Sequence, residues 1–94
     1  MIIRALGPSL SDFGIAGPLE DPMLSVYDRD GNAVGSNDNW QQGQQAEVMN
    51  SGLAPKDERE SALYIALPPG NYTAIVTGKN GGTGVGLVEG YNIQ

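Results

Sequence analysis

The chain has 94 residues and a mass of 9.9 kDa, which is enough for one domain, residues 1–94, with a thin hydrophobic core. It contains neither Cys nor His, and this excludes thiol catalysis, disulfide bonds, histidine-based triads and the usual zinc sites. The net charge of −6 makes nucleic acid a poor partner and favours hard cations. Since every apolar run is too short to cross a bilayer, we expect no membrane span.

Short apolar runs separated by Gly, Pro and Asn predict six strands. In chain order they are residues 2–6, 23–28, 32–36, 61–67, 72–77 and 85–93. We expect a loop over residues 9–22, one helical turn over 46–50 and a solvated cluster of charges over 56–60. This spacing predicts an all-β fold, a small antiparallel β-sandwich or jelly roll, in which the strands at 61–67 and 72–77 pair at the centre.

Three residues in this pattern each have two interpretations. Arg4 and Glu89 lie in apolar strands, so either both point inward and form a buried pair across neighbouring strands, or each faces solvent at an edge. Trp40 is the only Trp and lies in a polar loop. It either caps one end of the sandwich or offers an aromatic platform to a sugar or a partner. Because a thin core needs its large side chains, we expect Trp40 to be a cap.

Carboxylate and amide side chains gather in and just after the first hairpin. Asp28, Asp30 and Asn32 have the spacing i, i+2, i+4, and Asp38 follows a few residues later. Calcium binds roughly six to eight oxygens, so these four residues form a candidate calcium site. The alternative is that Asp and Asn suit turn backbones and hydrogen bond to their own chain. Apart from calcium, we expect no cofactor.

Two further motifs have weak specificity. Asn71 begins an Asn-x-Thr glycosylation acceptor directly after a Pro-Pro-Gly turn, although Asn is also a common turn residue. Residues 82–86 (GTGVG) superficially suggest a dinucleotide loop. They lack the last Gly of that motif and a following helix, so we expect a hairpin loop that leads into a strand.

Several segments resemble a bacterial extracellular repeat module that occurs in tandem in large secreted proteins. They are residues 3–10 (IRALGPSL), 21–24 (DPML), 27–28 (YD), 37–40 (NDNW), 52–55 (GLAP), 60–62 (ESA), 67–76 (LPPGNYTAIV) and 84–89 (GVGLVE). Residues 27–91 are also similar to the pre-peptidase C-terminal domains of secreted proteases, which are β-sandwiches. The resemblance implies an exported, non-catalytic module with an adhesive or structural role, and it identifies no ligand.

The modules of this type usually carry additional strands before the segment that corresponds to residues 3–8. A sandwich without such a strand has an unpaired edge. We therefore expect residues 1–10 to pair with a neighbouring subunit, with the contact made by Met1, Ile2, Ile3, Arg4, Ala5 and Leu6. A head-to-tail contact of this kind does not close on itself, so it propagates into a helical filament.

The function predicted from the sequence is therefore that of a structural protomer. The chain would form an extracellular bacterial filament or surface appendage by sharing β-strands between identical subunits. The alternative is a carbohydrate- or surface-binding β-sandwich module of a larger secreted protein, which should be monomeric and show an exposed aromatic cluster. We expect no enzyme, because a chain of this size leaves little room for a substrate cleft beside the core.

Overall fold

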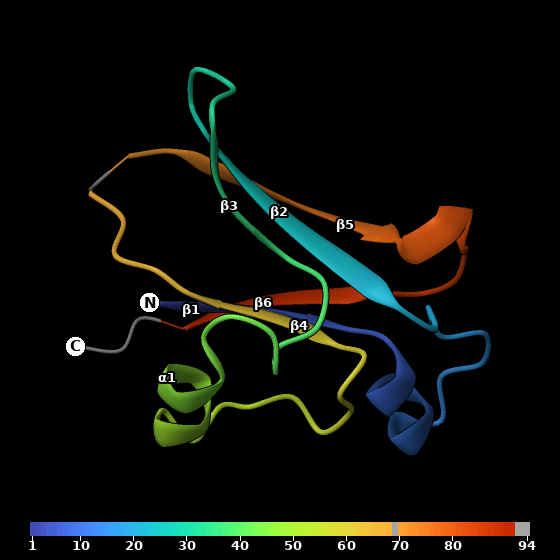
Figure 1. Cartoon of the computed structure of the whole chain (residues 1–94). Coiled ribbons are helices and arrows are strands. Elements are labelled where there is room, and N and C mark those ends of the chain that lie inside the picture. Colours follow the sequence, from blue (N-terminus) through green and yellow to red (C-terminus); the bar gives the residue numbers. More distant parts are fainter. Residues whose placement is uncertain (69, 92–94) are drawn as a thin grey trace.

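Six strands among the described residues form two antiparallel sheets. The structure is a computed structural model that describes residues 1–68 and 70–91. In the first sheet, β1 (Ile2–Leu6) lies between β4 (Ser61–Tyr64) and β6 (Leu87–Tyr91). In the second, β2 (Pro22–Asp28) lies between β3 (Ala33–Asn37) and β5 (Tyr72–Gly78). The sheets pack as a small β-sandwich (Figure 1), so the predicted all-β fold class is confirmed.

Three short helical segments join the strands within residues 1–68 and 70–91. The 3-10 helix η1 (Pro8–Phe13) follows β1 in the stretch for which a loop was predicted, and it ends at Gly14 with a φ of 79°. The helix α1 (Gln45–Asn50) confirms the helical turn predicted between β3 and β4. The 3-10 helix η2 (Lys79–Gly81) follows β5. The last strand begins two residues later than predicted, and its predicted residues 92–93 lie outside the described residues.

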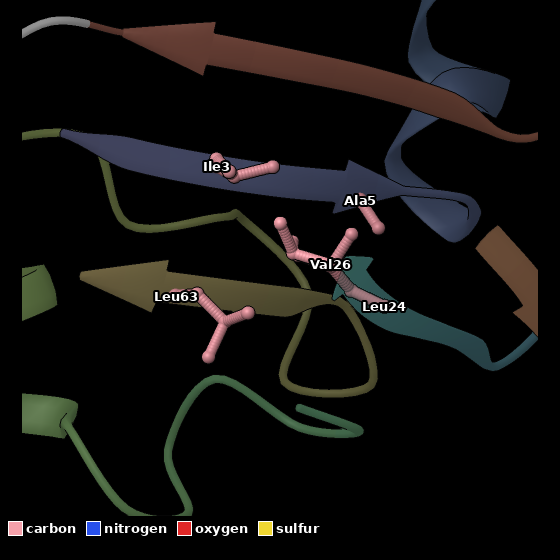
Figure 2. Packing of buried hydrophobic residues seen from close by; sticks show 5 residues of the cluster. All are labelled: Ile3, Ala5, Leu24, Val26 and Leu63. Carbon is pink, nitrogen blue, oxygen red and sulfur yellow. The ribbon is translucent and has the colours of Figure 1, made fainter. Parts of the chain in front are cut away.

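The core lies between the two sheets and is built from alternate residues of the central strands. Ile3 and Ala5 of β1 face Leu24 and Val26 of β2, and Leu63 of β4 joins them (Figure 2). All five side chains are buried. Burial of a Leu or Val side chain contributes roughly 1.5–3 kcal/mol, so this small cluster accounts for much of the stability available to a chain of this length.

A second cluster covers the outer face of the first sheet. Trp40, Val48 of α1 and Ala62 of β4 pack together, with Ala54 against them. Trp40 is only 8% exposed, so it is buried, as expected, but it covers the outer face of the first sheet and not one end of the sandwich. Cover on both faces of the sheet explains why Ile2, Ile3, Ala5 and Leu6 of β1 are all buried, with Arg4 the one charged residue of the strand.

The predicted central pairing between residues 61–67 and 72–77 is wrong. β4 pairs with β1, and β5 pairs with β2, so the two segments belong to different sheets. The hydrogen-bonded part of the first segment also ends at Tyr64. The chain from there to Tyr72 crosses from one sheet to the other, which a tight hairpin turn would not allow. Both segments still reach the same core, because Leu63 and Val76 face it from opposite sheets.

The prediction that Glu60 belongs to a solvated cluster is also wrong. Glu60 is completely buried, and one carboxylate oxygen, Oε2, accepts hydrogen bonds from the Gly7 N–H (2.7 Å), the Ser9 N–H (3.1 Å) and the Ser9 hydroxyl (2.6 Å). The other oxygen, Oε1, accepts the N–H of Asp57 at 3.2 Å. A buried carboxylate is tolerated only when such donors surround it. Glu60 therefore links the start of η1 to β4, the strand that begins at the next residue.

Arg4 and Glu89 pair across neighbouring strands, as one of the two interpretations had it, but the pair lies partly buried on the outer face of the first sheet and does not point into the core. They lie directly opposite each other on β1 and β6, and their side chains form an ion pair. Nη1 of Arg4 also donates to the Leu53 carbonyl at 3.2 Å, and its guanidinium lies 5.1 Å from the centre of the Tyr91 ring. The pair thus ties the loop before β4 to the outer face of the first sheet.

Candidate functional site

The first three residues of the candidate calcium site form a turn that satisfies its own hydrogen bonds. Oδ1 of Asp28 accepts the N–H groups of Asp30 (3.0 Å) and Asn32 (2.9 Å). The side-chain amide of Asn32 donates to Oδ2 of Asp28 at 3.3 Å. These bonds, led by the backbone N–H of Asn32, lower the pKa of Asp28 below its ordinary value. The geometry is that of a side chain that closes its own turn.

Asp38, the fourth predicted ligand, lies at the other end of β3. Ala33 at one end of this strand faces Tyr27, whereas Asn37 at the far end faces Leu24. Asp38 instead forms an ion pair with Lys79 of η2, with 2.7 Å between Oδ2 and Nζ. The structure therefore does not bring the four residues together. Over residues 1–68 and 70–91, no three acidic, His or Cys side chains are arranged to hold a metal ion.

Asp21, Asp38 and Lys79 form a cluster of ionisable side chains at this end of β3. The pKa of Asp21 is raised, first by its partial burial and then by the adjacent carboxylate of Asp38, while Lys79 opposes the rise. One carboxylate oxygen of each acid, Oδ1 of Asp21 and Oδ1 of Asp38, is buried without a hydrogen-bond partner among the described residues.

The candidate glycosylation residue is accessible. Asn71 is exposed and directly precedes β5, and Thr73 is exposed on that strand. The sequence motif remains a prediction at this position.

The residues predicted for inter-subunit pairing lie in the middle of the chain's own first sheet. Ile2, Ile3, Arg4, Ala5 and Leu6 form β1, which is paired with β4 on one side and β6 on the other. The terminal ammonium of Met1 donates to the Ile65 carbonyl, and the Ile65 N–H donates to the Met1 carbonyl, both at 2.9 Å. Donation of this segment to a neighbour would therefore require β1 to leave two strands of its own chain.

Exposed aromatic side chains do not form a binding platform in the described structure. Phe13 is 70% exposed on η1, whereas Tyr64 is 41% exposed on β4, at the opposite end of the β1–β4 pairing. Trp40 is buried, and the rings of Tyr27, Tyr72 and Tyr91 are partly buried. The feature that a carbohydrate-binding module should show is thus not assembled by these residues.

One side of the sandwich is closed. β3 lies over β4, and Gly35 of β3 leaves room for Leu63 and Ile65, whose methyl groups would lie 3.4 Å from a Cβ at that position. The edge of β4 is also blocked by side-chain amides. Gln44 accepts from the Tyr64 N–H (3.0 Å) and donates to the Tyr64 carbonyl (2.8 Å), and Asn37 accepts from the Ala62 N–H (3.0 Å).

The opposite side of the sandwich, where β5 lies over β6, is open. Pairing with β2 directs Ala74 and Val76 of β5 toward the core, and pairing with β1 directs Val88 of β6 the same way. Ala74 and Val88 are nevertheless exposed. We call this region the open side. It comprises the outer edges of β5 and β6 and their exposed apolar residues, Ala74, Ile75, Leu87 and Val88.

The backbone edges of the open side are unprotected. Outside the sheet ladders, no hydrogen bond within the described structure involves the backbone of residues 73–77 or 86–91. Natural sheets usually shield such edges with Lys, Pro, bulges or covering loops, but β5 has no charged residue and no Pro. Sequence reasoning missed this feature because it expected the second edge of β5 to be covered by residues 61–67.

Comparison of the chain with protein-family models, with curated proteins and with solved structures found no match. Among the described residues, no helix is long and apolar enough to cross a membrane.

Proposed function

We propose that the chain is a non-catalytic structural protomer of an extracellular bacterial filament or surface appendage, joined to identical subunits by β-strand pairing. The observation that carries this proposal is the open side, where two strand edges and core-facing apolar side chains are exposed together. Its placement outside the cell rests on the resemblance of the sequence motifs to an exported repeat module.

Pairing at the open side would stabilise an assembly in two ways. An added strand hydrogen bonds to the free N–H and C=O groups of an edge, and its alternate side chains cover the apolar positions between the sheets. An added strand would cover Val88 and Ala74, because both side chains face inward and are exposed. On the closed side, the side-chain amides of Gln44 and Asn37 already bind the β4 edge.

This proposal keeps the predicted strand pairing but moves the contact. The sequence analysis placed the inter-subunit contact on residues 1–10. In this structure, residues 2–6 of that segment form β1, the central strand of the first sheet. The exposed edges of β5 and β6 form contacts without unfolding any strand, so they are the more economical route to assembly. The alternative of a sugar-binding module gains no support from the separated Phe13 and Tyr64. Calcium or a glycan at Asn71 would be an addition to the assembly and is not required by it.

Negative-stain electron microscopy and light scattering over a range of protein concentrations test the proposal. We expect filaments or growing oligomers for the natural chain, and their loss in Val88→Lys, which places a charge on the open side. Val34→Lys is the matched control, because Val34 is similarly exposed, at 37% against 39% for Val88, but lies on β3 at the closed side. A natural chain that remains monomeric at every concentration would refute the proposal, as would equal loss of assembly in both variants.

A further inference from the structure

We propose that the edge of β5 pairs antiparallel with the same edge of a second copy of this chain, about a two-fold axis that passes beside Ile75. This inference deepens the proposed function, on which it rests for the use of the open side, by naming the strand, the register and the partner. The resulting dimer would contain one continuous six-stranded sheet, with strand order β3-β2-β5-β5-β2-β3 across the two copies.

The sequence of β5 is nearly symmetric about its central residue. Tyr72–Gly78 reads YTAIVTG, so an antiparallel copy centred on Ile75 brings like residues together. Thr73 would lie opposite Thr77, Ile75 opposite itself, and Ala74 opposite Val76. Thr–Thr and aliphatic cross-strand pairs stabilise sheets. The outermost pair places Tyr72 beside Gly78, an arrangement in which an aromatic ring covers the bare backbone of the glycine.

The two faces of the paired strand would both be compatible with burial. Pairing with β2 places Ala74 and Val76 on the core face, and Thr73, Ile75 and Thr77 on the outer face. On the core face, Ala74 is exposed in the single chain and would be covered by the second copy. On the outer face, Ile75 is 43% exposed, and two Ile75 side chains would shield each other. The register therefore places the most apolar outward residue at the centre of the contact.

Charge identifies a second copy as a suitable partner at this edge. The whole chain has a net charge of −6, so two copies repel each other wherever acidic groups meet. Residues 72–78 contain no Asp, Glu, Lys or Arg, and the contact itself therefore brings no like charges together. Self-pairing of β6 would differ, because its central residue is Glu89 and would lie opposite Glu89 of the second copy.

The pairing also satisfies the free backbone groups of β5. In an antiparallel pair every second residue exchanges two hydrogen bonds with its partner, so two seven-residue strands gain about six bonds. A two-fold contact closes on itself and gives a dimer, and a filament grows from such dimers only through a second, different contact. Dimerisation and filament growth can therefore be measured separately.

Sedimentation velocity combined with charge-reversal variants tests the inference. At concentrations too low for filaments to form, the natural chain should have the mass of a dimer, twice 9.9 kDa, and Ile75→Lys and Ile75→Glu should each have the mass of a monomer. Because residue 75 faces itself across the axis, mixing the two variants should restore the dimer. Val34→Lys, at the exposed position on the closed side, should remain dimeric. Circular dichroism verifies that each variant is folded.

A cysteine cross-link gives an independent readout of the register. The chain has no Cys, so Ile75→Cys introduces a single thiol, which should form a disulfide-linked dimer on mild oxidation. Denaturing, non-reducing electrophoresis should show this dimer for Ile75→Cys, whereas Val34→Cys, oxidised in the same way, should run as a monomer. Equal cross-linking of the two variants would overturn the inference.

Five outcomes decide this inference, and the last two separate it from the proposed function. A natural chain that stays monomeric, or an unmixed Ile75→Lys that stays dimeric, overturns the β5 contact. A natural chain that is monomeric but binds an unrelated extended peptide along β5 also overturns it, because the partner is then not a second copy. Dimers without filaments support the β5 contact and refute the filament. Filaments that persist in Ile75→Lys support the filament and refute the β5 contact.

Discussion

Glu60 offers the sharpest test of how this small sandwich is held together. Replacing it with Ala removes the acceptor of the Gly7 and Ser9 N–H groups, which are bonded at 2.7 and 3.1 Å in a buried site. Each buried donor left without a partner costs about 1–3 kcal/mol, and the Ser9 hydroxyl can rotate toward another acceptor. We therefore expect Glu60→Ala to lower the free energy of unfolding by about 3 kcal/mol, a change of roughly a hundredfold in the folding equilibrium.

This loss is large compared with the total stability. A chain of 94 residues is expected to have a free energy of unfolding of about 5–14 kcal/mol. Glu60→Gln keeps one carbonyl oxygen, which can accept the hydrogen bonds that Oε2 now accepts, but its amide N–H would face the Asp57 N–H. We therefore expect it to lower the free energy of unfolding by about 1 kcal/mol. Glu58→Ala is the control, because Glu58 is exposed in the same loop.

Urea unfolding followed by Trp40 fluorescence is the assay. Trp40 is the only Trp and is buried, so its emission reports the transfer of the core to water. The expected order of destabilisation is Glu60→Ala, then Glu60→Gln, then Glu58→Ala, with the last within about 0.5 kcal/mol of the natural chain. A Glu60→Ala variant as stable as Glu58→Ala would refute the reasoning.

Three further predictions follow from other parts of the structure. Burial and the Asp38 charge raise the pKa of Asp21, so the folded chain binds this proton more tightly than the unfolded chain, and stability should fall as pH rises above 3.8 through the raised pKa. Urea unfolding as a function of pH should show that Asp21→Asn removes this fall, and an unchanged profile would contradict it. Millimolar calcium should leave the melting temperature unchanged, because Asp28 already accepts bonds from its own turn and Asp38 lies elsewhere; a rise that Asp30→Ala abolishes would restore the calcium site. Leu24→Ala should cost about 2–5 kcal/mol, whereas Met49→Ala at an exposed position should cost little, and equal losses would show that the core is misplaced.

Local features of the fold could be predicted from the sequence because they depend on neighbouring residues. The strand Ile2–Leu6 follows from a short apolar run that ends at Gly7 and Pro8, and the β2–β3 hairpin follows from the turn that Asp28 begins. The single helical turn of α1 was recognised in the same way. Each of these elements is specified within a few residues along the chain.

Long-range features could not be predicted, because period-two alternation does not say which strand is the partner. Residues 61–64 and 72–78 are both short apolar runs, yet they join different sheets. Glu60 appeared as one of a run of charges, and its burial depends on donors from Gly7 and Ser9, more than fifty residues away. The open side became visible only once β1 was placed at the centre of its own sheet.

Amide hydrogen exchange measured as a function of protein concentration tests the use of the open side most directly. Association there predicts that the backbone amides of residues 73–77 become protected as the concentration rises, while those of α1 and β4 on the closed side exchange at unchanged rates. Exchange in β5 that is equally fast at every concentration, or protection that appears first on the closed side, would contradict the account.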